Sequence, residues 1–121
     1  GYLPLSESAE LSAVMEEAAK SVMGEDCLVF GSEITGSTDM GDVSCIMPVI
    51  QPSVGGFCGK LHSNDFAVAN EYTAYVKSAQ LLALTAAMLL ENGAEKARSV
   101  KESFAAKMTK SVYINYLEEK I

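Results

Sequence analysis

The chain has 121 residues and a formal net charge of −7, and 49% of its residues are hydrophobic. This length suits one domain with a core of its own, and this composition excludes a disordered segment. Its nine lysine and arginine residues are scattered, so we expect no nucleic-acid partner, because binding to phosphates requires clustered basic side chains.

The first predicted element is an amphipathic helix that ends at Gly24. Ser6 or Ser8 can cap its start, and apolar residues recur at helical spacing from Leu11 to Val22. Gly24 can adopt the left-handed conformation that a C-terminal cap requires. We expect this helix to lie on the surface of a larger structure.

Two short strands and one short helix are predicted next. Residues 27–30 form a continuous apolar run, which is typical of a strand that is buried on both faces. A helix is expected over residues 39–47, and a second strand begins at residues 49–50. The glycines of residues 55–59 then form a flexible loop that leads to the only histidine, His62.

A long helix is predicted over residues 70–91. Its second half, residues 79–90, is apolar nearly all round, so we expect burial on every side. Shorter helical stretches follow over residues 97–108 and 112–117. The apolar run 81–90 is too short to cross a bilayer, so we expect no membrane contact. Two strands alone make a weak sheet, and we therefore expect self-association or a larger molecule.

The three cysteines, Cys27, Cys45 and Cys58, cannot all pair within one chain. Their spacing also lacks the CxxC pattern of a metal-binding knuckle. We expect reduced thiols and a cytoplasmic location rather than a disulfide framework. Cys45 lies among apolar residues and is predicted to belong to the core.

His62 is the first candidate for chemistry, because it follows a glycine-rich loop and precedes a long apolar helix. From the residues alone, two roles remain open. The imidazole can bind a metal, or it can form an ordinary hydrogen bond with Asn64 or Asp65. A metal needs more than one protein ligand, so His62 cannot bind it tightly by itself.

The second candidate is the stretch of Gly36, Ser37, Thr38 and Asp39, which precedes the short predicted helix. Its small, hydroxyl and carboxylate groups can bind an anionic group of a substrate at the start of a helix. The same residues can instead form an ordinary helix cap. In that case Thr38 is the cap, and Asp39 and Asp42 lie beside the positive end of the helix dipole.

The chain resembles the C-terminal part of the catalytic domain of the M20 metallopeptidase family. The resemblance rests on the order of a helix, an apolar strand, the string Gly-Ser-Thr-Asp-Met-Gly-Asp-Val-Ser at residues 36–44, a glycine-rich loop, His62 and a long apolar helix. Within the family, the chain is similar to the amidohydrolase branch that includes the aminobenzoyl-glutamate hydrolases. The resemblance implies an α/β fold, in which the chain is a helix-rich C-terminal segment, with few strands, of a three-layer α/β/α zinc-exopeptidase-like domain.

The resemblance also implies the chemistry of a two-metal amidohydrolase. Two zinc or manganese ions bind between carboxylate and imidazole ligands, and a glutamate acts as general base. The substrate would be an N-acyl amino acid, an aminobenzoyl-glutamate-like compound or a dipeptide. His62 would be the C-terminal histidine ligand of one metal. Gly36, Ser37, Thr38 and Asp39 would line the substrate pocket.

Most functional residues of the family have no match in this sequence. Its His-x-Asp motif, bridging Asp and Glu-Glu pair are missing, since Glu16-Glu17 and Glu118-Glu119 fall on predicted surface helices. Residues 1–121 are therefore interpreted as a partial catalytic domain, without a catalytic residue and inactive alone. Two alternatives are a non-catalytic module that self-associates or binds a partner, and a chain to which the rest of the enzyme docks as a separate polypeptide.

Overall fold

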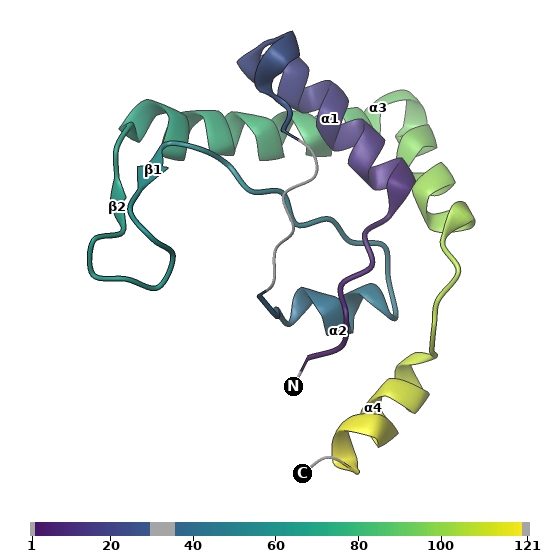
Figure 1. The fold of residues 1–121 in the computed structure, drawn as a ribbon. Coiled ribbons are helices and arrows are strands. Elements are labelled where there is room, and N and C mark those ends of the chain that lie inside the picture. The colour runs from purple at the N-terminus through teal and green to yellow at the C-terminus, as the bar shows by residue number, and fades with distance from the viewer. Residues whose placement is uncertain (1, 30–35, 120–121) are drawn as a thin grey trace.

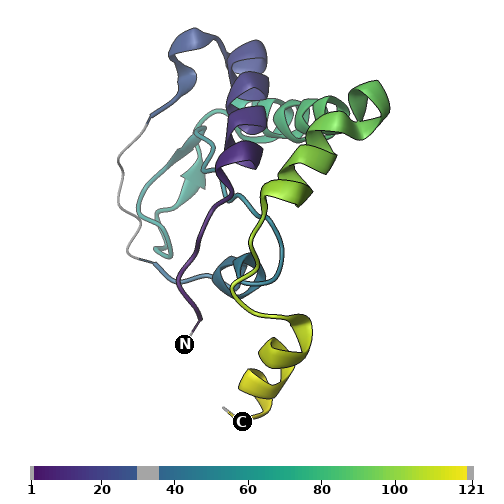
Figure 2. The ribbon, with the colours of Figure 1, turned by 90° about the vertical axis from the view of Figure 1, so that its right-hand side faces the viewer.

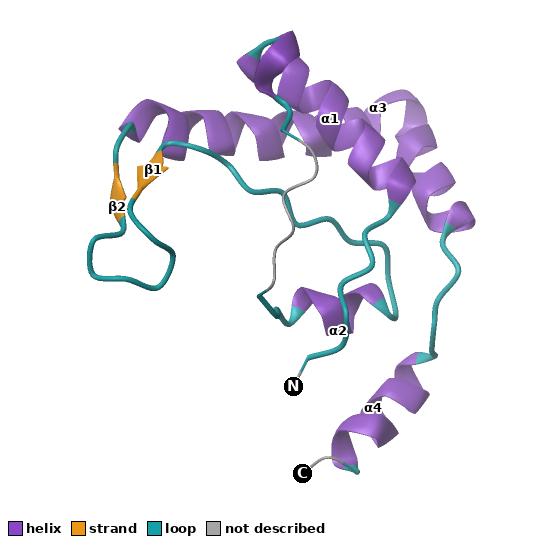
Figure 3. Cartoon of the chain, viewed as in Figure 1, coloured by secondary structure: helices purple, strands orange, loops and turns teal. Residues whose placement is uncertain are grey.

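The computed structural model describes residues 2–29 and 36–119, and helices dominate it (Figure 1). Helices make up 58% of the described residues, whose strands form a single two-stranded sheet. Figure 3 shows how small the strand content is beside the helices. In its coarse form, the prediction of a helix-rich chain with few strands is therefore confirmed.

Helix α1 (Ala9–Met23) begins and ends where the sequence predicts. The Ser8 hydroxyl oxygen accepts a hydrogen bond from the Leu11 amide at 3.3 Å, which satisfies one of the free N–H groups at the helix start. At the other end, Gly24 has a φ of 101°, and its amide donates to the Lys20 carbonyl at 2.8 Å. Both predicted ends of this helix are confirmed.

The strand predicted at residues 27–30 is wrong as far as the structure describes it. After α1 the chain forms a short 3-10 turn, η1 (Glu25–Cys27), and Val29 is 86% exposed. Phe30 lies outside the described residues. A strand needs a neighbour that accepts its hydrogen bonds, and no described segment pairs with residues 27–29.

The strand predicted at residues 49–50 is also absent from the sheet. Val49 is buried, and its carbonyl accepts a hydrogen bond from the Ser8 amide at 2.9 Å. The Gln51 amide donates to the carboxylate of Glu7 at 2.7 Å. These two bonds join the segment to the residues before α1, but they do not form the regular ladder of a sheet.

Helix α2 (Met40–Ser44) is shorter than the helix predicted over residues 39–47. Cys45 follows it and is buried, as predicted. The Cys45 carbonyl accepts hydrogen bonds from the amides of Lys107 and Met108 at 3.0 and 3.2 Å. The Cys45 carbonyl therefore bonds to the segment before the last helix, whereas in a longer α2 it would accept a hydrogen bond from within the helix.

The N-terminal segment packs on α2 so closely that residue 41 has no room for a side chain. A Cβ at Gly41 would lie 1.8 Å from the carbonyl oxygen of Leu3. The Leu3 amide donates to the Asp42 carboxylate at 2.9 Å, and the Ser6 amide donates to the hydroxyl of buried Ser44 at 3.1 Å. These bonds hold the segment against α2.

Strands β1 (Phe57–Cys58) and β2 (Ala67–Val68) form an antiparallel hairpin, in which Phe57 pairs with Val68. The rings of Phe57 and Phe66 stack, with their centroids 5.3 Å apart. In Figure 1 the hairpin and its loop project away from α1. Most of this small sheet is exposed, so it adds little to the core.

The long predicted helix is present, with a break where the sequence predicts its end. A π-helical turn, η2 (Tyr72–Lys77), continues directly into α3 (Ser78–Ser103). Within α3, the stretch from Glu91 to Ala94 has non-helical backbone angles, and Asn92, Gly93 and Ala94 have φ of 50°, 68° and 64°. Asparagine and glycine tolerate this left-handed conformation best.

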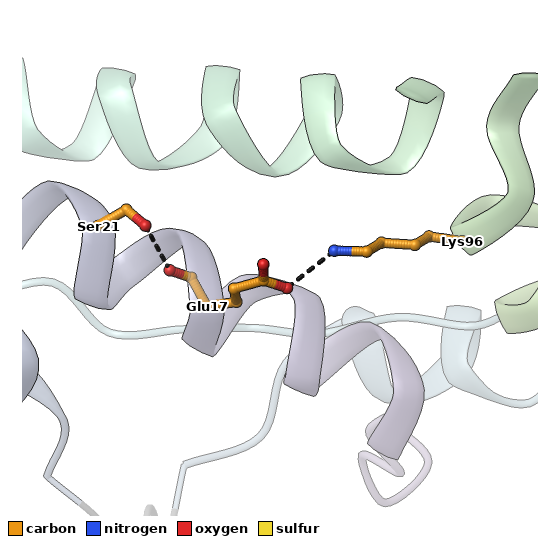
Figure 4. Close-up of polar contacts among 3 residues, drawn as sticks. All are labelled: Glu17, Ser21 and Lys96. Carbon is orange, nitrogen blue, oxygen red and sulfur yellow. Dashed lines mark hydrogen bonds and ion pairs between the residues drawn. The ribbon is translucent and has the colours of Figure 1, made fainter. Parts of the chain in front are cut away.

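The core lies where α1 crosses α3 (Figure 2). Its buried residues come from both helices: Val14, Met15, Ala18, Ala19, Leu81 and Met88. Within this contact, the Thr85 hydroxyl donates to the Leu81 carbonyl at 2.8 Å. Past the break, α3 meets α1 again through an ion pair between Lys96 and Glu17, whose N···O distance is 2.8 Å (Figure 4).

The outer side of α3 is uncovered, which contradicts the predicted all-round burial of residues 79–90. Leu82 and Leu90 are 61% and 69% exposed. The prediction is wrong for this chain because α1 covers one side of α3 and no other described element covers the opposite side. By length and composition alone, the helix over residues 72–103 could also cross a membrane, a property that core helices of soluble proteins share.

The last helix, α4 (Lys110–Glu118), is capped by Thr109, whose hydroxyl oxygen accepts a hydrogen bond from the Val112 amide at 3.3 Å. Its residues are exposed or only partly buried. The side chain of Tyr113 lies near Asp42 of α2. Partial burial, followed by the negative charge of Asp42, raises the pKa of Tyr113.

Candidate functional site

His62 lies in the loop that joins β1 to β2. Its φ is 63°, a left-handed conformation that is uncommon for a residue other than glycine. The side chain is exposed, and the imidazole makes no hydrogen bond to any residue that the structure describes. A bond to Asn64 or Asp65, which the structural alternative required, is therefore not formed. The imidazole is available to a ligand.

The loop is held together without the imidazole. The Ser63 amide donates to the Lys60 carbonyl at 3.1 Å, and the Phe66 amide donates to the Ser63 carbonyl at 3.3 Å. The Asp65 carboxylate accepts a hydrogen bond from the Lys60 amide at 3.4 Å. Hydrogen bonds from the Ser63 side chain and then from the Lys60 amide lower the pKa of Asp65, so this carboxylate is ionised at neutral pH.

Two glycines of the loop serve the packing of the hairpin. Gly59 has a φ of 82°, and a Cβ there would lie 2.2 Å from the Asp65 carbonyl oxygen. Gly56 has a φ of 98°, and a Cβ there would lie 2.6 Å from the amide nitrogen of Ala74. The Gly56 carbonyl also accepts a hydrogen bond from the Asn70 amide at 3.0 Å. These contacts fix the hairpin against the start of η2.

The second candidate stretch is arranged as the start of α2. Asp39 is the N-cap residue, but its carboxylate makes no capping bond. The Thr38 hydroxyl donates to this carboxylate at 3.3 Å and accepts a hydrogen bond from the Met40 amide at 3.4 Å. Thr38 thus supports the helix start, but the N-cap residue is Asp39, whereas the capping alternative predicts Thr38. Gly36 and Ser37 are exposed.

A pocket of about 320 Å³ lies beside Thr38 and Asp39. Its other walls come from Met40, from residues 50–54, and from Ser78, Leu81 and Leu82 at the start of α3. The other two predicted substrate residues and His62 do not line it. The structure therefore brings two of the four predicted substrate residues to one pocket, and it does not bring His62 into that pocket.

A larger pocket, of about 490 Å³, lies between α1 and residues 50–55. The sequence does not predict this pocket. Much of its wall is apolar and includes Met15, Met23, Ile50, Val54 and Leu81. Glu16 also lines it and is partly buried, although the sequence places this residue on a water-facing surface. No local signal reveals this position, because residues 50–55 approach α1 only in the folded chain.

Metal ligands are not clustered in residues 2–29 and 36–119. No three side chains of histidine, cysteine, aspartate or glutamate lie close enough together there to hold a metal ion. His62 is exposed on its loop, and Cys27, Cys45 and Cys58 are free thiols. His62 can therefore supply one ligand, and a complete site would need further ligands from outside these residues.

Comparisons with models of protein families, with curated proteins and with solved structures give no match to this chain. Family and function are therefore proposed from the residues and their geometry.

Proposed function

We propose that the chain is the C-terminal segment of the catalytic domain of a metal-dependent amidohydrolase of the M20 metallopeptidase family. The intact enzyme holds two zinc or manganese ions in a three-layer α/β/α domain. It hydrolyses the amide bond of an N-acyl amino acid, an aminobenzoyl-glutamate-like compound or a dipeptide. His62 is one metal ligand in this enzyme, and residues 36–39 help to line the substrate pocket.

The observation that carries this proposal is the state of His62. Its imidazole is exposed and makes no hydrogen bond to a described residue, and its backbone has the unfavourable φ of 63°. Strained backbone of this kind is typical of functional positions. A histidine whose only role was to stabilise its loop would form hydrogen bonds within that loop. The hydrogen bond to the Asp65 carboxylate and the close packing at Gly59 already stabilise it. A free imidazole on an ordered loop suits a metal ligand.

The residues at hand fit one part of such a metal site. Neutral imidazole is a common zinc ligand, and carboxylates and further imidazoles complete the coordination. In this proposal the remaining ligands come from the N-terminal part of the domain. When bound, the ions polarise the carbonyl group of the substrate. His62 contributes one ring nitrogen from its place in the hairpin loop.

The uncovered side of α3 supports the view that the chain is part of a larger domain. Tyr72, Tyr75, Leu82 and Leu90 are all more than half exposed along η2 and α3. A row of large apolar side chains on one face is typical of a surface that a partner covers. The two-stranded sheet is likewise too small to be stable without neighbours. A further layer of the same domain would cover both.

The test begins with the reading frame upstream of the Gly1 codon, where we expect a His-x-Asp motif and a Glu-Glu pair. The full product is then purified and assayed for zinc or manganese content and for hydrolysis of an N-acyl amino acid. We expect His62→Ala to lower both metal content and hydrolysis. The matched control is Leu61→Ala, because Leu61 is 72% exposed in the same loop, and it should leave both unchanged.

Three outcomes would contradict parts of this proposal. A start codon within a few residues of Gly1 would reject the enzyme and favour a stand-alone module that associates through α3. Unchanged metal content in His62→Ala would reject the role of His62 as a ligand. Hydrolysis by the purified chain with added zinc or manganese would show that this segment is active by itself.

A further inference from the structure

We propose that Asn92-Gly93, at the break within α3, is a site of spontaneous deamidation that converts Asn92 to aspartate or isoaspartate. The inference is independent of the proposed function. It concerns a modification of the chain itself, and it rests on the sequence, the exposure and the backbone of this break.

The reaction needs only water. The amide nitrogen of Gly93 attacks the side-chain carbonyl carbon of Asn92, and a new N–C bond forms while the nitrogen loses its proton. The bond from that carbon to the side-chain nitrogen breaks, and ammonia leaves. Water then opens the resulting cyclic succinimide at either carbonyl. One opening gives aspartate, and the other gives isoaspartate, in which the backbone runs through the side-chain Cβ.

The attacking nitrogen is accessible. Gly93 has no Cβ, and apart from its two chain neighbours and the nearby backbone of α3, no atom lies within 4 Å of the place that a Cβ would occupy. Asn92 and Gly93 are both exposed, and the Asn92 side chain makes no hydrogen bond to a described residue. The carbonyl carbon and the nitrogen can therefore approach each other without displacing other side chains.

The backbone at this point is free of the regular helix. Residues 91–94 have non-helical angles, and three consecutive residues have positive φ, including Ala94, for which this conformation is unfavourable. Residues 91–93 are exposed, so a local change of their backbone angles breaks no buried contact. The succinimide can therefore form while α1 and α3 stay packed.

Some charges around the break favour the deamidation of Asn92, and others oppose it. Arg98 Nη1 donates a hydrogen bond to the Gly93 carbonyl, which belongs to the peptide unit that follows the reacting one, and so places a positive charge near the attacking nitrogen. This charge favours the amide anion that attacks the side chain. Glu91 and Glu95 flank the break and oppose that anion. Replacing the arginine by glutamine should therefore slow the reaction.

The chain supplies its own controls in the other three asparagines, Asn64, Asn70 and Asn115. Each is followed by a residue that carries a side chain, which hinders the attack. The side-chain oxygen of Asn70 also accepts a hydrogen bond from the Thr73 amide at 2.9 Å, and Asn115 lies within α4. We expect Asn92 to convert before any of them.

The test incubates the full chain at neutral and mildly alkaline pH and digests samples with trypsin over time. The tryptic peptide that ends at Lys96 contains Asn92 and no other asparagine. We expect two acidic products of this peptide, one of them isoaspartyl, at a rate that rises with pH because the attacking nitrogen must lose its proton. Gly93→Ala should slow their formation severalfold, and Arg98→Gln should slow it to a smaller extent.

Two results would overturn the proposal. The first is conversion of Asn92 in the folded chain that is no faster than conversion of Asn64. The second is a rate in the folded chain far below the rate in urea, which would show that the break protects the asparagine. The measurement in urea and the circular dichroism of each variant keep the test decisive if Gly93→Ala folds poorly.

Discussion

Replacing Gly41 with alanine should destabilise the chain, although helix propensity alone predicts the opposite. Gly41 lies in α2, and alanine is favoured over glycine within a helix by about 1 kcal/mol. A Cβ here would lie 1.8 Å from the carbonyl oxygen of Leu3. The N-terminal segment must therefore move away from α2 to make room for it.

The size of the effect follows from the hydrogen bonds that this movement breaks. The bond from the Leu3 amide to the Asp42 carboxylate is worth about 1.5–3 kcal/mol, because its acceptor is charged. The bond from the Ser6 amide to the Ser44 hydroxyl is worth about 0.5–1.5 kcal/mol. After the propensity gain is subtracted, we expect the free energy of unfolding to fall by about 2 kcal/mol.

Urea unfolding followed by far-UV circular dichroism measures this free energy. Gly55→Ala is the matched control, since a Cβ there would have no atom within 4 Å apart from its two chain neighbours, and we expect a change within about 0.5 kcal/mol. In a chain that begins at Ser6 the obstructing carbonyl is gone, and Gly41→Ala should become neutral or stabilising. Equal or higher stability of Gly41→Ala in the full chain would refute the packing of the N-terminal segment on α2.

Two further predictions concern the core and the C-terminal helix. Leu81→Ala should lower the free energy of unfolding by about 2–5 kcal/mol, because Leu81 is only 3% exposed. Leu82→Ala, the control, should change it by about 0.5 kcal/mol or less. Equal effects of the two substitutions in urea unfolding would contradict the placement of α1 on α3. The pKa of Tyr113 is raised above 10.0, first by burial and then by Asp42. The folded chain keeps this proton where the unfolded chain loses it, so stability should fall as the pH rises through 10.0 and above. Tyr113→Phe should reduce this fall in unfolding experiments at alkaline pH, and an unchanged pH profile would contradict the contact.

The helix ends could be predicted from the sequence because a few neighbouring residues determine each of them. Ser8 caps α1 and Gly24 ends it, as the sequence indicates, and the predicted end of the long helix at residue 91 coincides with the break within α3. The absence of the predicted strands at residues 27–29 and 49–50 could not be foreseen in this way. An apolar run becomes a strand only when another strand lies beside it, and that neighbour is decided by distant parts of the chain.

The candidate site, too, could be predicted from the sequence only in part. The sequence singles out His62 because it is the only histidine and follows a glycine-rich loop, and the structure leaves its imidazole available. The sequence does not reveal that Gly56 and Gly59 are needed for close packing of the hairpin. It also cannot reveal that Glu16 lines a pocket, because the opposite wall comes from residues 50–55.

The sequence of α3 contains more apolar surface than this chain buries. Leu81 and Met88 pack against α1, while Leu82 and Leu90 on the other side remain in water. Burial of apolar surface is the main favourable term in folding and association, so the outer side of α3 can still contribute to stability. The apolar pattern of the sequence predicts which residues are buried in the complete assembly. The structure shows only which residues are buried within this chain. The difference between them marks the surface available to a partner, and the proposed function assigns that surface to the rest of the catalytic domain.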